Sequence, residues 1–180
     1  FQFREKGDIV YLRAGTLEKV TVGSGFMFQN YNSSPLFPVQ RVLGLEAGFD
    51  MGVSGMDLFF NDIYDPEIIG GRFFFRPLFA LPLLGKFQIG LQGGIDKNPL
   101  GEFHNPAFFY FALDFNLPLL ELDVLSLTFF ADIAKQGMYY ADWDKRPAAW
   151  ADGTDFMHVH LNDNYGMDAG FKGNMTRYFL

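Results

Sequence analysis

His158 and His160 are the two side chains in this sequence whose spacing best suits metal binding. In an extended segment both imidazoles would point to one face, with Asp155 and Asp163 nearby. Imidazole nitrogens and carboxylate oxygens are suitable ligands for Zn²⁺ and other borderline metals. Two histidines without a fixed third ligand are also typical of a polar loop, so we predict no cofactor and keep this pair as the one metal candidate.

Ser126 is the best candidate nucleophile, because Asp132 shares its face of a predicted strand. Serine hydrolysis also needs a base in contact with the serine, and no histidine falls in a predicted strand near Ser126. We therefore predict a non-enzymatic protein with no catalytic residue. A barrel enzyme that acts on lipid or peptide stays open as an alternative.

Glu46 and Asp50 also share one strand face, and paired carboxylates can carry out acid–base chemistry. Arg72 and Arg76 carry the opposite charge in another predicted strand. Ion pairs between these carboxylates and arginines are the simpler interpretation, so we expect the four side chains to be structural.

An alternation with a period of two predicts that these residues lie on β-strands. From Leu43 to Val53 every second residue is apolar, and the residues between them are glycine or acidic. A helix over residues 119–135, framed by Pro118 and Gly137, remains an alternative for that stretch. The predicted strands span residues 8–14, 17–28, 41–53, 56–61, 68–76, 86–95, 107–117, 124–134, 165–172 and 175–180, with a two-residue turn at 173–174.

One face of the predicted sheet is rich in Phe and Leu, whereas the other carries glycine and charge. We predict that the apolar face contacts lipid, at Phe73, Phe75, Phe109, Phe111, Phe115, Leu127 and Phe129. We predict that the polar face lines a lumen, at Arg13, Glu46, Asp50, Arg72, Arg76, Asp114 and Asp132. A soluble sheet would bury its apolar face as an ordinary core. A soluble β-barrel that binds an apolar ligand is therefore the second interpretation.

The composition limits the classes of protein to which this chain can belong. Its 180 residues include 23 Phe and no Cys, which excludes disulfides and thiolate metal sites. The net charge of -7 comes without a basic stripe, so nucleic acid is not an expected partner. No apolar run reaches the roughly 20 residues of a transmembrane helix. Alternating transmembrane strands of about 9–11 residues leave the mean hydropathy near zero, as it is here.

Long and short connections alternate along the predicted strands. The long ones are residues 29–40, 62–67, 96–106 and 135–164. Outer-membrane barrels have short turns on one side of the membrane and long loops on the other. We therefore predict one domain over residues 1–180. It would be an all-β, antiparallel, up-and-down transmembrane barrel of about 8–10 strands, or part of a larger barrel.

Four short motifs add a family resemblance. They are residues 22–32 (VGSGFMFQNYN), Arg76-Pro77-Leu78 before Gly90-Leu91, Asp96-Lys97-Asn98-Pro99, and Leu117-Pro118-Leu119 before Leu125-Ser126-Leu127. Together they resemble a poorly characterised, porin-like family of bacterial outer-membrane β-barrel proteins. The resemblance implies location in the outer membrane and barrel architecture, and we expect a pore, transport or surface structural role. It carries over no catalytic residue, and we expect the chain to be a segment of a longer member. We expect the lipid bilayer and other barrel or outer-membrane proteins as partners.

Overall fold

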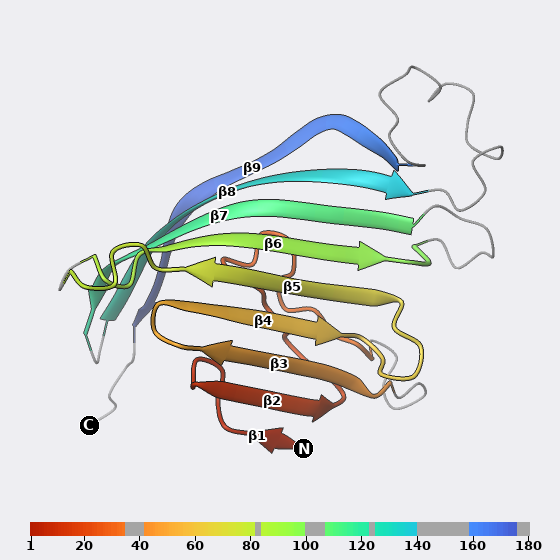
Figure 1. The fold of residues 1–180 in the computed structure, drawn as a ribbon, viewed down its shortest axis with the longest axis horizontal. Helices are drawn as coiled ribbons and strands as arrows, with labels where there is room; N and C mark the ends of the chain where they lie inside the picture. The colour runs from red at the N-terminus through yellow and green to blue at the C-terminus, as the bar shows by residue number, and fades with distance from the viewer. Residues whose placement is uncertain (35–41, 82–83, 100–106, 123–124, 140–158, 176–180) are drawn as a thin grey trace.

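The computed structural model describes residues 1–34, 42–81, 84–99, 107–122, 125–139 and 159–175, the last range with side chains over 165–173 only. These residues form one antiparallel sheet of nine strands whose spatial order follows the sequence (Figure 1). No helix occurs in these residues, so the predicted all-β, antiparallel, up-and-down arrangement is confirmed. The strands are β1 (Gln2–Phe3), β2 (Val10–Gly15), β3 (Gly44–Asp50), β4 (Ser54–Phe60), β5 (Ile68–Phe75), β6 (Gln88–Asp96), β7 (Ala107–Glu121), β8 (Leu125–Tyr139) and β9 (Val159–Met175).

The sheet is open. Strands β1 and β9 form its two edges, at opposite sides of the ribbon in Figure 1, and no pairing joins them within the described ranges. The edges are also unequal, because β1 has 2 residues and β9 has 17. Two strands so different in length cannot satisfy each other's backbone hydrogen bonds. An open nine-stranded sheet therefore replaces the predicted closed barrel in this part of the chain.

The predicted strand over residues 17–28 is wrong. This stretch belongs to the connection between β2 and β3, where Val20 and Tyr31 form only an isolated bridge. The φ angles of Gly23 and Gly25 are 61° and 97°, in the left-handed region that glycine tolerates. Those angles turn the chain back on itself, which an extended strand cannot accommodate. The local alternation of apolar residues in this stretch comes from packing against the sheet rather than from membership of it.

The strands of the second half run further than predicted. The described residues of the range 119–135 form no helix, because β7 continues to Glu121 and β8 begins at Leu125. Strand β8 extends to Tyr139, inside the predicted long loop 135–164. Strand β9 continues through the predicted turn at residues 173–174, since each added residue gains a backbone partner on β8. The last predicted strand, residues 175–180, lies almost entirely outside the described residues.

Connections at the two ends of the sheet differ in length. One end carries residues 16–43, 61–67, 97–106 and 140–158. The other end carries residues 4–9, 51–53, 76–87 and 122–124. As a group the first set is longer, but residues 76–87 outnumber both residues 61–67 and residues 97–106, so the predicted alternation of long and short connections is not strict. We call the first the long-loop end and the second the short-loop end.

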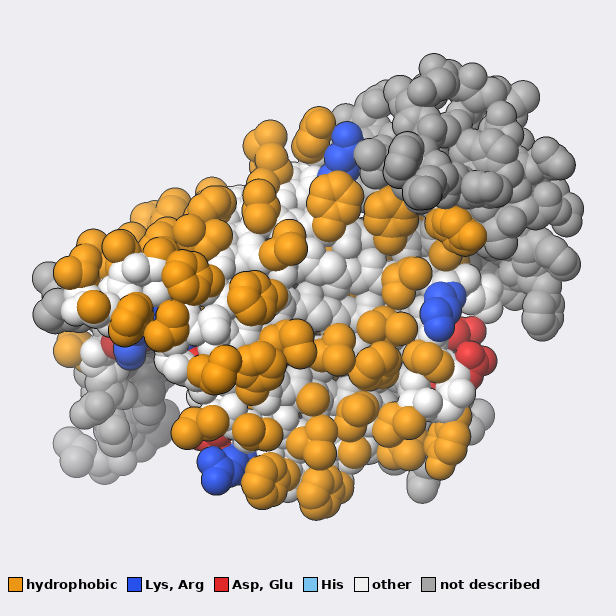
Figure 2. All heavy atoms as spheres, in the orientation of Figure 1, with side chains coloured by type: hydrophobic (Ala, Val, Ile, Leu, Met, Phe, Trp, Pro, Cys, Tyr) orange, Lys and Arg blue, Asp and Glu red, His pale blue; other side chains and the backbone are white. Residues whose placement is uncertain are grey.

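The two faces of the sheet carry different kinds of side chain. Residues 16–34, which we call the inner segment, cross one face and lie behind the strands in Figure 1. We call that face the inner face. Leu17, Val20 and Val22 of the inner segment pack with Phe59 of β4 as the buried apolar core. The opposite, outer face carries many exposed apolar side chains, as Figure 2 shows.

Candidate functional site

Hydrogen bonds fold the inner segment into a compact unit. The Leu17 amide donates to Ser33 Oγ at 3.0 Å. Val20 and Tyr31 exchange two backbone hydrogen bonds, each 2.9 Å long. These bonds satisfy backbone groups that the core would otherwise leave unpaired. The segment therefore lies on the inner face as an ordered element.

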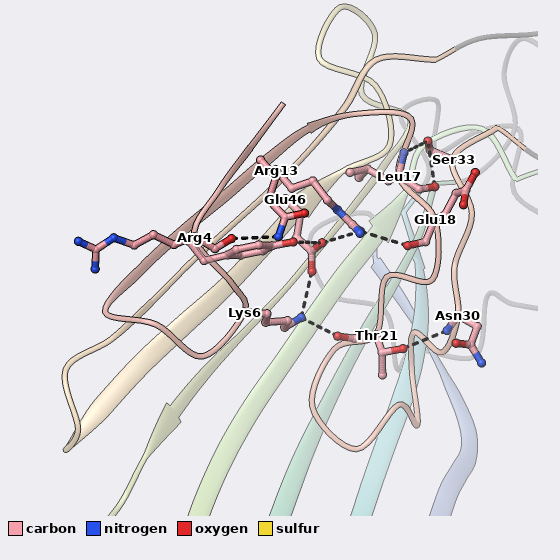
Figure 3. Close-up of polar contacts among 11 residues, drawn as sticks. Arg4, Lys6, Arg13, Leu17, Glu18, Thr21, Asn30, Ser33 and Glu46 are labelled. Carbon is pink, nitrogen blue, oxygen red and sulfur yellow. Dashed lines mark hydrogen bonds and ion pairs between the residues drawn. The ribbon is translucent and has the colours of Figure 1, made fainter. Parts of the chain in front are cut away.

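Two cationic side chains fasten the inner segment to the rest of the chain. Lys6 Nζ donates to the Thr21 carbonyl at 2.7 Å, and Arg13 Nη2 donates to the Glu18 carbonyl at 3.2 Å (Figure 3). Both bonds are charge-assisted, which makes them stronger than bonds between neutral groups. The inner segment is thereby attached to the side of the sheet that holds β1 and β2.

Glu46 of β3 accepts from the same two cations and from a tyrosine. Its carboxylate lies 3.0 Å from Lys6 Nζ and 2.7 Å from Arg13 Nη2, and it accepts from Tyr11 Oη at 3.0 Å (Figure 3). Three donors compensate for burying a carboxylate that is only 5% exposed. The predicted pairing of Glu46 with Arg72 or Arg76 is wrong, because the register places Arg13 directly opposite Glu46.

Asp50 forms the ion pair that the sequence predicts. Its two carboxylate oxygens accept from Arg76 Nη1 at 2.6 Å and Nη2 at 2.7 Å. This is the bidentate geometry that suits a guanidinium and a carboxylate. The Phe74 ring lies between Arg76 and Arg72, whose guanidinium carbons are 4.8 and 4.9 Å from its centroid. The ring thus joins two charged centres on the inner face.

Arg72 and Asp114 form the most buried ion pair of the described residues. Arg72 Nε lies 3.1 and 2.9 Å from the two oxygens of Asp114, and Nη2 also contacts the carboxylate. Gln92 and Asn116 donate to the same carboxylate at 3.1 and 2.7 Å. Arg72 Nη1 donates to Gln88 Oε1 at 3.0 Å. The side chain of Asp114 is fully buried, and this network compensates for its desolvation.

Three aspartates lie side by side across β7, β8 and β9. Asp132 pairs in register with Asp114 on one side and with Asp168 on the other. Like charges at directly opposed positions repel each other. Within the described ranges only Asp114 of these three has an ion-pair partner. Asp132 and Asp168 thus add two carboxyl groups to this part of the inner face, whereas Arg72 compensates the charge of Asp114.

Tyr31 is the titratable side chain of the inner segment whose pKa is shifted by burial. Its ring packs against Phe59 with centroids 5.4 Å apart. Desolvation raises the pKa of Tyr31, and the negative charges of Asp96 and Glu67 raise it further. The neutral phenol is therefore the form that fits the folded inner segment.

The alternation in the sequence assigns individual residues to the correct face of the sheet. The seven residues predicted to line a lumen all lie on the inner face or at its end: Arg13, Glu46, Asp50, Arg72, Arg76, Asp114 and Asp132. The seven residues predicted to face lipid all lie in outer-face rows: Phe73, Phe75, Phe109, Phe111, Phe115, Leu127 and Phe129. Phe73 is 50% exposed and Phe111 is 41% exposed. Contact with lipid and lining of a lumen remain predictions for these residues.

The candidate catalytic and metal-binding residues do not come together in the described part of the chain. Ser126 pairs with Asn174, whereas His160 pairs with Met138 at the other end of the β8–β9 ladder. His158 lies outside the described residues. No group of three or more His, Cys, Asp or Glu side chains that could hold a metal ion occurs among the described residues.

Sequence reasoning missed Lys6, Tyr11 and the inner segment. Lys6 and Tyr11 become important only through their contacts with Glu46, which lies 40 and 35 residues away. The signal that could have identified the inner segment is Gly23-Ser24-Gly25. Two glycines separated by one residue are more typical of a turn than of a strand interior.

Comparison with known proteins identifies no relative of this chain. No family model, no curated protein and no solved structure matches it. Among the described residues, no helix has the length and apolar character needed to cross a bilayer.

Proposed function

We propose that this sheet is part of the wall of a bacterial outer-membrane β-barrel with a non-enzymatic role in transport or surface structure. In this proposal the outer face contacts lipid, and the inner segment occupies the lumen. One observation carries it: apolar side chains are exposed on the outer face, while ion pairs are buried on the inner face.

The distribution of exposed apolar side chains supports lipid contact. Leu91, Leu113 and Phe171 are 54%, 46% and 67% exposed, on β6, β7 and β9. Apolar surface in water costs about 25 cal/mol per Å², and large contiguous patches mark interaction surfaces. Figure 2 shows such side chains over most of the outer face. A soluble barrel that binds an apolar ligand would enclose this face, so the arrangement favours the membrane proposal.

Strand length supports a bilayer-spanning role for half of the sheet. A transmembrane strand needs about 9–11 residues. Strand β6 has 9 residues, and β7, β8 and β9 have 15, 15 and 17. Strands β3 and β4 have 7 residues each and are shorter than this. We therefore assign the span to β6–β9, with β5 at its margin.

Lys135 and Tyr165 fit the proposed membrane interface at the long-loop end. They pair in register next to Phe111, in one outer-face row. Lys135 Nζ lies 4.4 Å from the centroid of the Tyr165 ring and 3.3 Å from its hydroxyl. Aromatic and cationic side chains anchor membrane proteins where hydrocarbon meets headgroups.

The open edges require further strands in this proposal. Unpaired backbone groups of β9 cannot face hydrocarbon, because nothing there replaces their hydrogen bonds to water. Strands additional to the described sheet would complete the wall, in this protein or from another barrel protein. In this structure the inner segment and the ion pairs of Glu46 and Asp114 lie on the inner face, where an open pore would need space.

Labelling at adjacent residues on opposite faces tests lipid contact. The chain has no Cys, so single substitutions Phe129→Cys and Thr128→Cys each introduce one reactive thiol. Each variant, carrying an environment-sensitive fluorophore, is reconstituted in vesicles with and without a lipid-chain quencher. We expect quenching at residue 129 and at a second outer position, Leu91→Cys, but not at residue 128. Equal quenching at residues 128 and 129, or none at any position, would refute the proposal.

A further inference from the structure

A cavity of about 640 Å³ lies between the inner segment and the sheet, towards the long-loop end. Phe26, Phe28 and Tyr31 line it from the inner segment. Tyr110 of β7 and Asp96 at the end of β6 line it from the sheet. This volume is sufficient for a small organic molecule, and sites of this kind combine apolar walls with a few polar groups.

Aromatic rings dominate the walls of this cavity. Phe28 packs edge-on against Phe59, with centroids 4.9 Å apart, and Tyr31 contacts the same ring. These contacts fix two of the rings that line the cavity. Fixed aromatic faces attract cations through the negative potential of their π-systems.

Asp96 is the acidic residue of the lining. It takes part in none of the ion pairs among the described residues. Its Oδ1 accepts from the Asn98 amide at 3.1 Å, which orients the carboxylate. Glu67 adds a second negative charge nearby, since both carboxylates act on the Tyr31 hydroxyl. Lys135 also borders the cavity, but its ammonium group is held by the ring and hydroxyl of Tyr165.

We propose that this cavity binds a small organic cation of the ammonium class. The alkyl groups of the cation would contact the ring faces of Phe28, Tyr31 and Tyr110, and Asp96 would supply the opposite charge. A neutral apolar ligand would use the same rings but would gain nothing from the carboxylate. The assignment depends only on the lining residues, so it does not rest on the membrane location proposed above.

A pair of matched probes tests the charge requirement on the purified protein. Choline and 3,3-dimethylbutan-1-ol have nearly the same shape, but only choline is charged. We expect choline to bind at least about tenfold more tightly in calorimetric titration, as cation–π and ion-pair contacts predict. Equal affinities would show an apolar cavity without cation selectivity and would overturn the proposal, as would the absence of choline binding.

Substitution of Asp96 tests where the cation binds. We expect Asp96→Asn to remove the preference for choline. Asp65→Asn is the matched control, because Asp65 is exposed on the connection 61–67 and does not line the cavity. If Asp96→Asn retains the full preference, or if Asp65→Asn loses it equally, the cation does not bind at Asp96. The comparison of the two probes on the unmodified protein decides the question of cation selectivity even if a variant fails to fold.

Discussion

The guanidinium of Arg72 on β5 reaches the carboxylate of Asp114 on β7 across the strand that separates them. Its Nε lies 2.9 Å from Asp114 Oδ2. Gly90 of β6 pairs directly with Asp114, and a Cβ at Gly90 would lie 2.7 Å from Arg72 Nε. The ion pair between Arg72 and Asp114 therefore needs the space that Gly90 leaves on β6.

Removing one partner of this pair should destabilise the protein strongly. Asp114→Asn leaves the buried guanidinium of Arg72 without a counter-charge, so we expect the free energy of unfolding to fall by about 3–5 kcal/mol. Denaturant titration measures the change. Glu121→Gln is the control, because Glu121 pairs with Lys86 at the surface and such pairs contribute about 0–1 kcal/mol. Similar losses in both variants would contradict a special role for the buried pair.

Gly90→Ala should weaken the same ion pair without changing a charge. The added methyl group would contact the Asp114 carboxylate and Arg72 Nε, and neither can move away without losing hydrogen bonds. We expect a loss of about 1–3 kcal/mol in the free energy of unfolding, typical of overpacking.

Gly93→Ala in the same strand provides the comparison for that experiment. A Cβ at Gly93 meets only the Tyr110 carbonyl oxygen, at 3.8 Å, which is an ordinary van der Waals contact. We expect this variant to keep the stability of the unmodified protein. If the two alanine variants unfold at the same denaturant concentration, Gly90 has no particular role.

The alternation of apolar and polar residues predicted which side chains lie on each face of the sheet. It did not predict the inner segment, which crosses the inner face. Residues such as Glu46 and Phe49 fall on opposite faces because a strand has a period of two, and this holds for any strand. Val20 and Val22 show the same alternation in a segment that is not a strand. The pairing of Arg72 with Asp114 joins residues 42 apart, so it depends on register and not on a local pattern.

A charge on the outer face should destabilise the protein in a membrane. For Phe115→Arg, four residues along β7 from the row of Phe111, Lys135 and Tyr165, we expect a loss of about 2–4 kcal/mol if residue 115 lies near the middle of the bilayer. The free energy of unfolding in lipid vesicles gives the result. Tyr64→Arg is the control, since Tyr64 is 85% exposed on the connection 61–67 and should tolerate the charge. A Phe115→Arg variant as stable as the unmodified protein would contradict lipid contact at this position.

Tyr31→Phe should change how stability depends on alkaline pH. Burial raises the pKa of Tyr31 above the value of about 10 in an unfolded chain. The folded state therefore binds this proton more tightly than the unfolded state, and stability falls as the pH rises above about 10. We expect Tyr31→Phe to lose less stability than the unmodified protein between about pH 8 and pH 11. Equal losses in both proteins would show that Tyr31 does not link the inner segment to this titration.

Gly23→Ala should loosen the inner segment. Gly23 has a φ of 61°, where alanine is strained by roughly 1–2 kcal/mol, and an added Cβ would lie 2.7 Å from Gln92 Nε2. The strain and the close contact act where the inner segment meets Gln92 and Arg72, so we expect faster proteolysis within residues 16–34. If the membrane proposal is correct, we also expect higher ion conductance in planar bilayers.

Gly52→Ala separates the two causes, because Gly52 has a φ of 84° but nothing within 4 Å of an added Cβ. It carries backbone strain in the connection 51–53, at the short-loop end of the sheet. We expect its inner segment to resist protease as well as that of the unmodified protein. If Gly52→Ala exposes residues 16–34 as much as Gly23→Ala does, general destabilisation explains both results. The contact between Gly23 and Gln92 would then have no specific part in holding the inner segment on the sheet.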